Sequence, residues 1–316
     1  MLQVSCNNKI NVNSNWQETI VIYGILEPGK DQQKIRVSKA FQNTNSSALK
    51  AAQISDSIFL DTVIVRLTDL STGQKYILTP SFAEPKEPGI FANDKNPIYL
   101  LDKTIHGHVV KEYNDYEIEV LNPKTGSRTH AKTRTLEESR LISPIQSNTD
   151  VFLFGTQPTF SIKPGRGAYT YSGNFDFHYK EWNALNGDST NQNIRWKFMN
   201  SLFVNPGGIS SNVKMPRKNF FQLLSWNLIE NKDLRRRTSH CDFIWTGGNK
   251  DFYDFISINR PSIGVVQKQT QYTNVVNGFG LFASRTIQTI KNCQIHSGFT
   301  YTLQNDYETQ DLNFEY

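Results

Sequence analysis

The residue of this chain best suited to covalent chemistry is Cys6. It follows the short stretch 2–5, in which a small residue, Ser5, stands directly before the cysteine. This arrangement is typical of the end of a bacterial lipoprotein signal, where the cysteine thiol receives acyl chains. Two or three acyl chains hold a protein on a bilayer, because each buried methylene contributes about 0.8 kcal/mol. The sequence therefore predicts a lipid anchor at Cys6; the alternative is a chance Ser-Cys pair.

Histidines and cysteines also occur in spacings that can bind metal. His240 and Cys241, together with Cys293 and His296, have the residue types of a four-ligand zinc site. His240 and Cys241 are adjacent, however, and adjacent side chains on a strand point to opposite faces. We therefore predict no metal site from this set. The two cysteines fit either a disulfide or two separate buried thiols, since a buried free cysteine behaves as a small hydrophobe.

Other motifs of catalysis or metal binding are weak or missing. His106 and His108 flank Gly107, but no third ligand stands near them in the sequence. The chain contains no Gly-x-Ser-x-Gly, His-Glu-x-x-His or Gly-x-x-x-x-Gly-Lys motif. We predict no catalytic residue, no metal ligand and no cofactor, and hence a protein that is not an enzyme.

Three consecutive arginines, Arg235, Arg236 and Arg237, follow a predicted helix at 219–231. Guanidinium groups bind phosphate and carboxylate groups, so the triplet is a candidate contact for an anion or a lipid headgroup. The alternative is that the three cations are solvated and interact with the C-terminal end of the helix, where each contributes about 0.3–1 kcal/mol. The chain has no nucleic-acid recognition motif, and we predict no nucleic-acid partner.

The stretch 274–285 combines a turn with apolar residues. Asn277-Gly278 favours positive φ and a tight turn. Phe279 and Phe282 follow it and supply apolar bulk. The stretch is either a structural turn that fills the core between domains or a contact loop for a partner, formed by Asn277, Gly278, Phe279 and Phe282.

Short strands at near-regular spacing must position these residues. Between 18 and 138, alternating apolar and polar residues predict antiparallel strands, as at 33–41, and turn residues separate them, as at 71–73. This pattern is typical of an immunoglobulin-like antiparallel β-sandwich. Apolar residues at helical spacing predict helices at 219–231 and 251–259.

The whole chain is therefore predicted to be mainly β and to have two domains. The predicted parts are a polar tether at 1–17, the sandwich at 18–138, a linker at 139–150, a second β-rich domain with two short helices at 151–299, and an acidic C-terminal tail at 300–316. The tail holds four acidic residues and no basic residue. Polar, Asn- and Ser-rich residues at 7–17 suit a flexible connection between lipid and domain.

Composition and charge restrict the possible partners. Hydrophobic residues make up 37% of the chain, and no apolar run approaches the roughly 20 residues that a membrane-spanning helix requires. The formal net charge is +5. In the segment 147–299, 17 basic residues stand against 9 acidic ones. This excess could attract anionic lipid, polysaccharide or an acidic partner; the alternative is ordinary surface charge.

Several stretches also resemble one known family. They are VIYGIL (21–26), RVSKAF (36–41), GIFA (89–92), YEIEV (116–120), AKTRTL (131–136) and YTNVVNGFGLFASR (272–285). Together they resemble an uncharacterised family of Bacteroidetes outer-membrane lipoproteins, defined by a domain of unknown function. The resemblance extends from about residue 18 to about residue 290, and the stretches that carry it are structural rather than catalytic.

The resemblance implies an exported protein that is lipid-anchored in the outer membrane, on its periplasmic or its cell-surface face. Members of this family often accompany large outer-membrane transport proteins. We therefore expect a non-enzymatic accessory or docking subunit whose partner is an outer-membrane β-barrel protein or transporter complex. The alternative is a glycan- or small-ligand-binding lipoprotein that works with a transporter, because Tyr169, Tyr171, Tyr179 and Trp182 surround a polar loop, as aromatic residues do on sugar-binding surfaces.

The anchor prediction is tested by the variant Cys6→Ala. Without the thiol no acyl chain is attached, so we expect the protein to move from the membrane fraction to the soluble fraction when cells of the source organism are fractionated. Cys241→Ala serves as the matched control and leaves the protein in the membrane fraction. Intact-mass measurement of the natural protein that finds an unmodified amino end would contradict the prediction.

Overall fold

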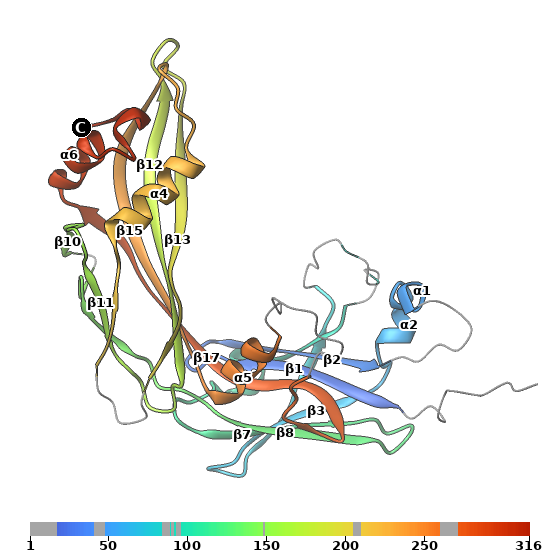
Figure 1. Cartoon of the computed structure of the whole chain (residues 1–316). Coiled ribbons are helices and arrows are strands. Elements are labelled where there is room, and N and C mark those ends of the chain that lie inside the picture. Colours follow the sequence, from blue (N-terminus) through green and yellow to red (C-terminus); the bar gives the residue numbers. More distant parts are fainter. Residues whose placement is uncertain are drawn as a thin grey trace, which may run out of the picture.

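The computed structural model describes residues 18–40, 48–83, 89, 92, 96–147, 149–204, 210–259 and 271–316. Cys6 and the predicted tether at 1–17 lie outside the described residues. Two β-rich domains stand at a steep angle to each other, and the long strand β17 (Gly278–Ile295) runs from one into the other (Figure 1). No helix within the described residues is long and apolar enough to cross a membrane.

The first domain is a β-sandwich whose two sheets enclose one hydrophobic core. Its first sheet consists of β17, β1 (Thr19–Leu26), β2 (Gln32–Ala40), β6 (Ile98–Asp102) and β5 (Thr79–Ser81) in that order. The second sheet consists of β16 (Val275–Val276), β8 (Arg128–Arg134), β7 (Asp115–Leu121), β3 (Ile64–Asp69) and β4 (Lys75–Ile77). The helices of this domain are short, α1 (Ala48–Ala52), α2 (Ser55–Ile58) and α3 (Lys103–His106).

The strands of the sandwich form where the sequence alternates. Ile20 and Ile22 of β1 are buried, and Tyr116, Ile118 and Val120 of β7 are buried opposite them in the core, while their neighbours in the sequence point outward. Period-2 burial of this kind is the signature of an antiparallel strand with one face in the core.

The second domain is built on a sheet of long strands. They are, in order, β13 (Ser189–Phe203), β12 (Thr170–Asn183), β15 (Leu234–Gly248) and the C-terminal half of β17. Two short strands extend this sheet: β10 (Val151–Phe152) pairs with β17, and β18 (Phe314–Glu315) pairs with β15. A smaller sheet contains β14 (Ser211–Lys214), β11 (Thr159–Lys163) and β9 (Arg140–Ser143). The helices are α4 (Arg217–Asn227), α5 (Lys250–Ile258), α6 (Ser297–Asn305) and the 3₁₀ helix η1 (Gln310–Leu312).

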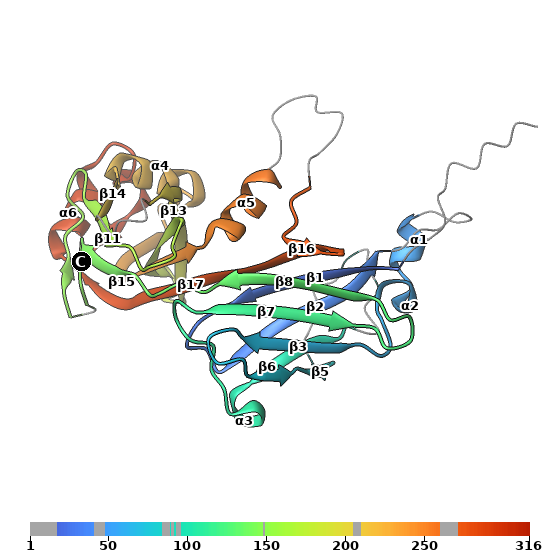
Figure 2. The same ribbon diagram turned by 90° about the horizontal axis from the view of Figure 1, so that it is seen from below.

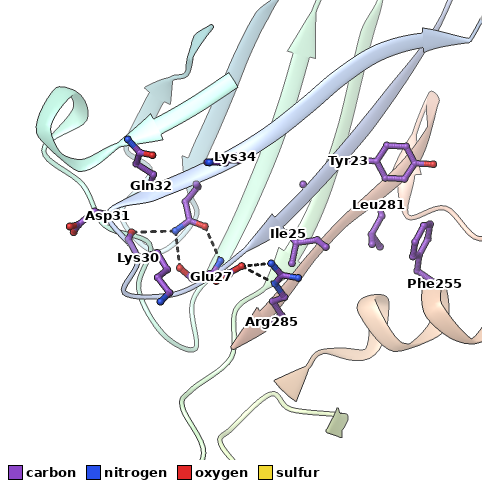
Figure 3. A pocket seen from close by; sticks show the side chains of 12 residues that line it. Tyr23, Ile25, Glu27, Lys30, Asp31, Gln32, Lys34, Phe255, Leu281 and Arg285 are labelled. Carbon is purple, nitrogen blue, oxygen red and sulfur yellow. Dashed lines mark hydrogen bonds and ion pairs between the residues drawn. The ribbon is translucent and has the colours of Figure 1, made fainter. Parts of the chain in front are cut away.

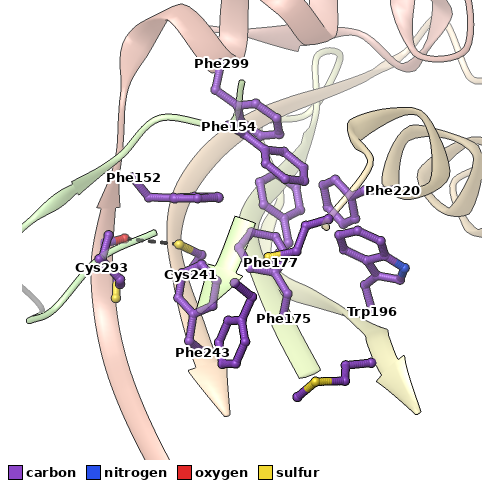
Figure 4. Packing of buried hydrophobic residues seen from close by; sticks show 14 of the residues in the cluster. Phe152, Phe154, Phe175, Phe177, Trp196, Phe220, Cys241, Phe243, Cys293 and Phe299 are labelled. Carbon is purple, nitrogen blue, oxygen red and sulfur yellow. Dashed lines mark hydrogen bonds between the residues drawn. The ribbon is translucent and has the colours of Figure 1, made fainter. Parts of the chain in front are cut away.

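Aromatic rings fill the core of the second domain (Figure 4). The ring of Phe175 on β12 lies 5.3 Å from that of Phe220 on α4 and 5.2 Å from that of Phe243 on β15, both edge-on. Such edge-to-face pairs contribute about 0.5–1.5 kcal/mol beyond the burial of their area. Gly173 leaves room beside the ring of Phe198, since a Cβ there would lie 2.7 Å from it.

Strand β17 connects the two domains by backbone hydrogen bonds. From Gly278 to Ser284 it pairs in parallel with β1. From Arg285 to Gln294 it pairs antiparallel with β15. Figure 2 shows this single strand passing from the sandwich to the second domain. Residues 275–284, which fall in the predicted second domain, are thus part of the first sandwich.

The structure confirms the predicted fold class, a mainly β chain with an immunoglobulin-like antiparallel sandwich followed by a second β-rich domain. The helices predicted at 219–231 and 251–259 are present as α4 and α5. Residues 139–150, predicted as a linker, include the strand β9, which pairs with β11.

The prediction of an acidic tail at 300–316 is wrong. This segment contains most of α6, then η1 and β18, and its apolar side chains Leu303, Leu312 and Phe314 are buried in the second core. The segment is therefore part of the second domain, because burial of these apolar side chains stabilises it there.

A substitution at Gly280 tests the pairing of β17 with β1. Its φ is +114°, and a Cβ there would collide with the carbonyl group of Ile22. Gly29 also has positive φ, +77°, but a Cβ there meets no atom within 4 Å. We expect Gly280→Ala to lower the free energy of unfolding by about 3–4 kcal/mol, and the control Gly29→Ala by only about 1–2 kcal/mol, in urea denaturation followed by circular dichroism. Equal losses for the two variants would contradict the close approach of these strands.

Candidate functional site

The outward face of the first sheet is apolar where β1 and β17 lie side by side. The parallel register places Val21 beside Phe279 and Tyr23 beside Leu281. Tyr23 is 45% exposed and Phe279 is 48% exposed. The outer face of a sandwich sheet is normally polar, because it faces water. Exposed aromatic rings on this face therefore mark it as a candidate binding surface.

Helix α5 forms the wall of a groove on this face. The ring of Phe255 on α5 packs edge-on against that of Tyr23, with 6.0 Å between the ring centroids. The groove has a volume of about 710 Å³. Figure 3 shows Tyr23, Leu281 and Phe255 together at one end of the groove. The charged residues Glu27 and Arg285 lie in the middle, and Lys30 and Asp31 lie toward the other end. The size lies within the range of about 300–1,000 Å³ that is common for ligand sites.

The charged part of the groove is held in a defined geometry. Arg285 donates from Nε and Nη2 to one carboxylate oxygen of Glu27, at 2.8 and 2.6 Å. The side-chain amide of Gln33 accepts from the backbone N–H of Glu27 at 2.8 Å and donates to its carbonyl at 2.7 Å. Gln33 is buried, so these bonds fix the turn between β1 and β2. The groove thus offers an aromatic half and a charged half, a combination that is common in ligand-binding sites.

The predicted contact loop is divided between the surface and the core. Asn277 has φ of +58° and makes the predicted turn, and its carbonyl accepts from the Thr129 hydroxyl at 3.0 Å. Gly278 begins β17, and Phe279 is exposed beside the groove. Phe282 is 0% exposed and belongs to the first core, so the expectation that it contacts a partner is wrong. Three positions separate Phe279 from Phe282, and an odd spacing on a strand places the two rings on opposite faces.

The arginine triplet is not one anion site. It begins β15, whereas α4 already ends at Asn227, so the predicted interaction with the end of a helix is also wrong. Arg236 is 1% exposed and donates to Glu181 at 2.7 Å and to the backbone carbonyls of Leu312 and Ile229. Three of its five N–H donors are used, and because the side chain is buried an external anion cannot reach the others.

The two other arginines of the triplet have separate contacts. Arg235 donates to the backbone carbonyl of Lys232 at 2.6 Å and lies 3.9 Å from the carboxylate of Glu315. Arg237 is exposed and stacks over the ring of Trp182 at 5.6 Å. Alternation on β15 turns Arg236 inward and its two neighbours outward.

The histidines and cysteines considered for zinc do not converge on one point, although Cys241 and Cys293 are partners in the pairing of β15 with β17. Cys241 and Cys293 are free buried thiols, and burial raises the pKa of the Cys241 thiol. His240 lies on the opposite face of β15 from Cys241, as alternation predicts. His296 accepts from the Gly298 backbone N–H at 3.0 Å and begins α6, so it serves as a helix cap.

His106 and His108 also have structural partners. His106 belongs to α3, and its Nε2 lies 2.8 Å from the carbonyl of Ile77. His108 lies between the hydroxyl groups of Tyr76 and Tyr116, at 3.0 and 3.3 Å. Burial lowers the pKa of His108, so the ring is neutral at pH 7.

One histidine that the sequence did not single out has a close polar environment. His178 on β12 lies beside His240 and Asp242 on β15, and the two imidazole rings stack with 4.2 Å between centroids. The spacing of His240 and Asp242, two residues apart on a strand, indicates that they share a face. The approach of His178 depends on the pairing of β12 with β15, which the sequence pattern does not specify.

Comparison with known proteins leaves the family open. No protein-family model and no curated protein matches the chain. A chain of a cytokine receptor complex has 7% identity over 88% of this chain and 99% of its own length, with a TM-score of 0.24. The FN1–FN3 domains of chicken CNTN1 have 8% identity over 87% of this chain and 66% of their own, with a TM-score of 0.21. The C-terminal globular domain of an oligosaccharyltransferase from Pyrococcus abyssi has 9% identity over 69% and 44%, with a TM-score of 0.21. These similarities are too low to bear on function.

Arg236 and Arg237 allow a matched test of the triplet. Arg236→Ala leaves Glu181 without its partner and two buried carbonyls without donors, so we expect a loss of about 3–5 kcal/mol in the free energy of unfolding. Arg237→Ala removes only an exposed cation–π contact and costs about 0.5–1 kcal/mol. Chemical denaturation measures both values. A stable Arg236→Ala protein would show that the guanidinium group is not a structural element.

Proposed function

We propose that this protein is a non-enzymatic, lipid-anchored accessory subunit of the cell envelope that docks on an outer-membrane protein. The observation that carries the proposal is the apolar outer face of β1 and β17, where Tyr23 and Phe279 are exposed beside the groove under α5. Large exposed aromatic rings on a rigid sheet lose little conformational entropy on binding and are frequent anchors of protein interfaces.

The position of this face supports a partner in the membrane. Strand β1 begins at Thr19, at the end of the sandwich that lies away from the second domain (Figure 1). If Cys6 is acylated, residues 7–17 connect the lipid to this end, and fully extended they span about 36 Å. The face of β1 and β17 is then held close to the membrane, where an integral outer-membrane protein is available to it.

The groove also favours a second candidate function, the binding of a glycan or another small ligand delivered to a transporter. Its volume and its combination of aromatic rings with a fixed Glu27–Arg285 ion pair are suited to such a ligand. The aromatic cluster that suggested sugar binding in the sequence does not add to this, since Tyr171 and Tyr179 are buried in the core and Trp182 lies beneath Arg237.

The docking proposal is tested with the double variant Tyr23→Ser, Phe279→Ser, expressed in the source organism in place of the natural chain. Loss of two central apolar anchors costs about 2 kcal/mol or more, so recovery of the membrane partner falls at least about tenfold. Recovery is measured by quantitative mass spectrometry after detergent extraction and purification of the complex. Circular dichroism checks that the variant retains its fold.

Leu185→Ser is the matched control, because Leu185 is 79% exposed at the turn between β12 and β13, away from the groove. It leaves the recovery of the partner unchanged. The docking proposal fails if the natural chain purifies without a membrane partner, or if the double variant retains it. A glycan that binds to the natural chain and not to the double variant, with no protein partner recovered, would favour the second candidate.

A further inference from the structure

The outward face of the second domain carries a compact group of metal-ligand side chains. His178 projects from β12, and His240 and Asp242 project from the neighbouring strand β15. Their sequence neighbours Phe177 and Cys241 point the other way, into the aromatic core. One ligand atom from each of the three side chains lies within 4.8 Å of the other two. All three side chains are partly buried.

Irregularities in the two strand pairs create this arrangement. The register between β12 and β15 shifts next to His178, which consequently faces both Ser239 and His240. A second shift, between β15 and β17, occurs next to Asp242. There Asn292 adopts a φ of +59°. Such bulges redirect side chains and are over-represented beside functional sites.

Neighbouring groups orient two of the three side chains, Asp242 and His240. The Asn292 backbone N–H donates to Oδ1 of Asp242 at 2.8 Å. The Ser239 hydroxyl lies 2.9 Å from Nδ1 of His240, which orients the ring and leaves Nε2 as its ligand atom. Metal-binding histidines and carboxylates are typically supported by hydrogen bonds of this kind on their other polar atom. Nε2 of His178 lies 3.2 Å from Oδ2 of Asp242, a contact between two of the ligand groups that a bound ion would replace.

We propose that His178, His240 and Asp242 bind a divalent transition metal ion, with Zn²⁺ the ion best suited to them. Zinc binds both imidazole nitrogen and carboxylate oxygen, and three protein ligands leave a fourth position for water or an external ligand. Bond lengths of about 2.0–2.2 Å require ligand atoms about 3.3–3.6 Å apart in a tetrahedral site. The 3.2 Å between His178 and Asp242 is close to that value, whereas the two imidazole rings, now stacked 10° from parallel, must rotate so that a nitrogen of each faces the ion.

Charges around the site are compatible with a cation. One basic side chain near the site, Arg195 on β13, already makes a bidentate ion pair with Asp176, at 2.7 and 2.6 Å. Its charge is therefore offset, and Asp242 remains to neutralise part of the metal charge. The site lies on the second domain and is independent of the docking face on the first.

The experiment uses the full chain in the Cys6→Ala background, so that the N-terminal thiol cannot bind metal, and without a polyhistidine tag. After chelator treatment, Zn²⁺ alone is titrated by isothermal calorimetry. We expect saturable binding of one ion per chain. His178→Ala and Asp242→Asn each weaken it by at least about 100-fold, since loss of even a supporting residue costs about 10–100-fold.

A histidine outside the site provides the control. His130 lies on β8 of the first domain, and His130→Ala leaves zinc affinity unchanged. Co²⁺ titration provides a readout of geometry, because a four-coordinate site gives intense visible absorption that a hydrated ion lacks. Circular dichroism establishes that each variant is folded. Absence of saturable binding, equal weakening by His130→Ala, or a spectrum of hydrated Co²⁺ overturns the proposal.

Discussion

Strand β17 is shared by both domains, and the relation between them depends on its hydrogen bonds. It is 18 residues long, and its first part adds a parallel edge to the sandwich while its second part adds an antiparallel neighbour to β15. A flexible linker would allow the domains to rotate independently. A continuous strand does not, because rotation would break backbone hydrogen bonds whose donors and acceptors are buried.

The point at which β17 changes partner is reinforced by side chains. The Ser284 hydroxyl donates to the carbonyl of Leu26 at 2.9 Å, and Arg285 binds Glu27. Asn249 caps α5 and also donates to the Thr133 hydroxyl at 2.8 Å, which joins the helix to the first sandwich. The groove owes its shape to this junction, since its floor is β1 and β17 and its wall is α5. A binding surface that must present exposed rings in a fixed arrangement benefits from such support.

The strands of the two domains carry different types of residue on their outer faces. In the first domain, the outer face of β1 and β17 is apolar, which suits contact with another protein. In the second domain, the inner faces of β12 and β15 carry the aromatic core, and the outer faces carry histidines and carboxylates. The proposed docking face and the polar cluster therefore lie on different domains, and a change in one does not require a change in the other.

Local features of this protein follow from its sequence alone. Alternating residues in β1 and β7 produce strands, apolar residues at helical spacing produce α4 and α5, and Asn277-Gly278 produces a turn, because each pattern acts within a few neighbouring residues. The presence of Phe279 and Phe282 on one strand was not foreseen, since the glycines around them suggested a loop.

Long-range features were decided only by the tertiary structure. Which strand lies beside β17, which histidine lies beside His240, and whether the C-terminal residues join the core all depend on contacts between segments far apart in the chain. The ring of Phe314 is buried because β12 provides a core for it, although the acidic residues nearby led to the prediction of a separate tail. Arg236 is buried because alternation on β15 turns its side chain inward, where the carboxylate of Glu181 on β12 accepts a hydrogen bond from it. The free energy of such contacts comes from side chains on different strands, so the residue pattern of a single segment cannot predict which segments will pair.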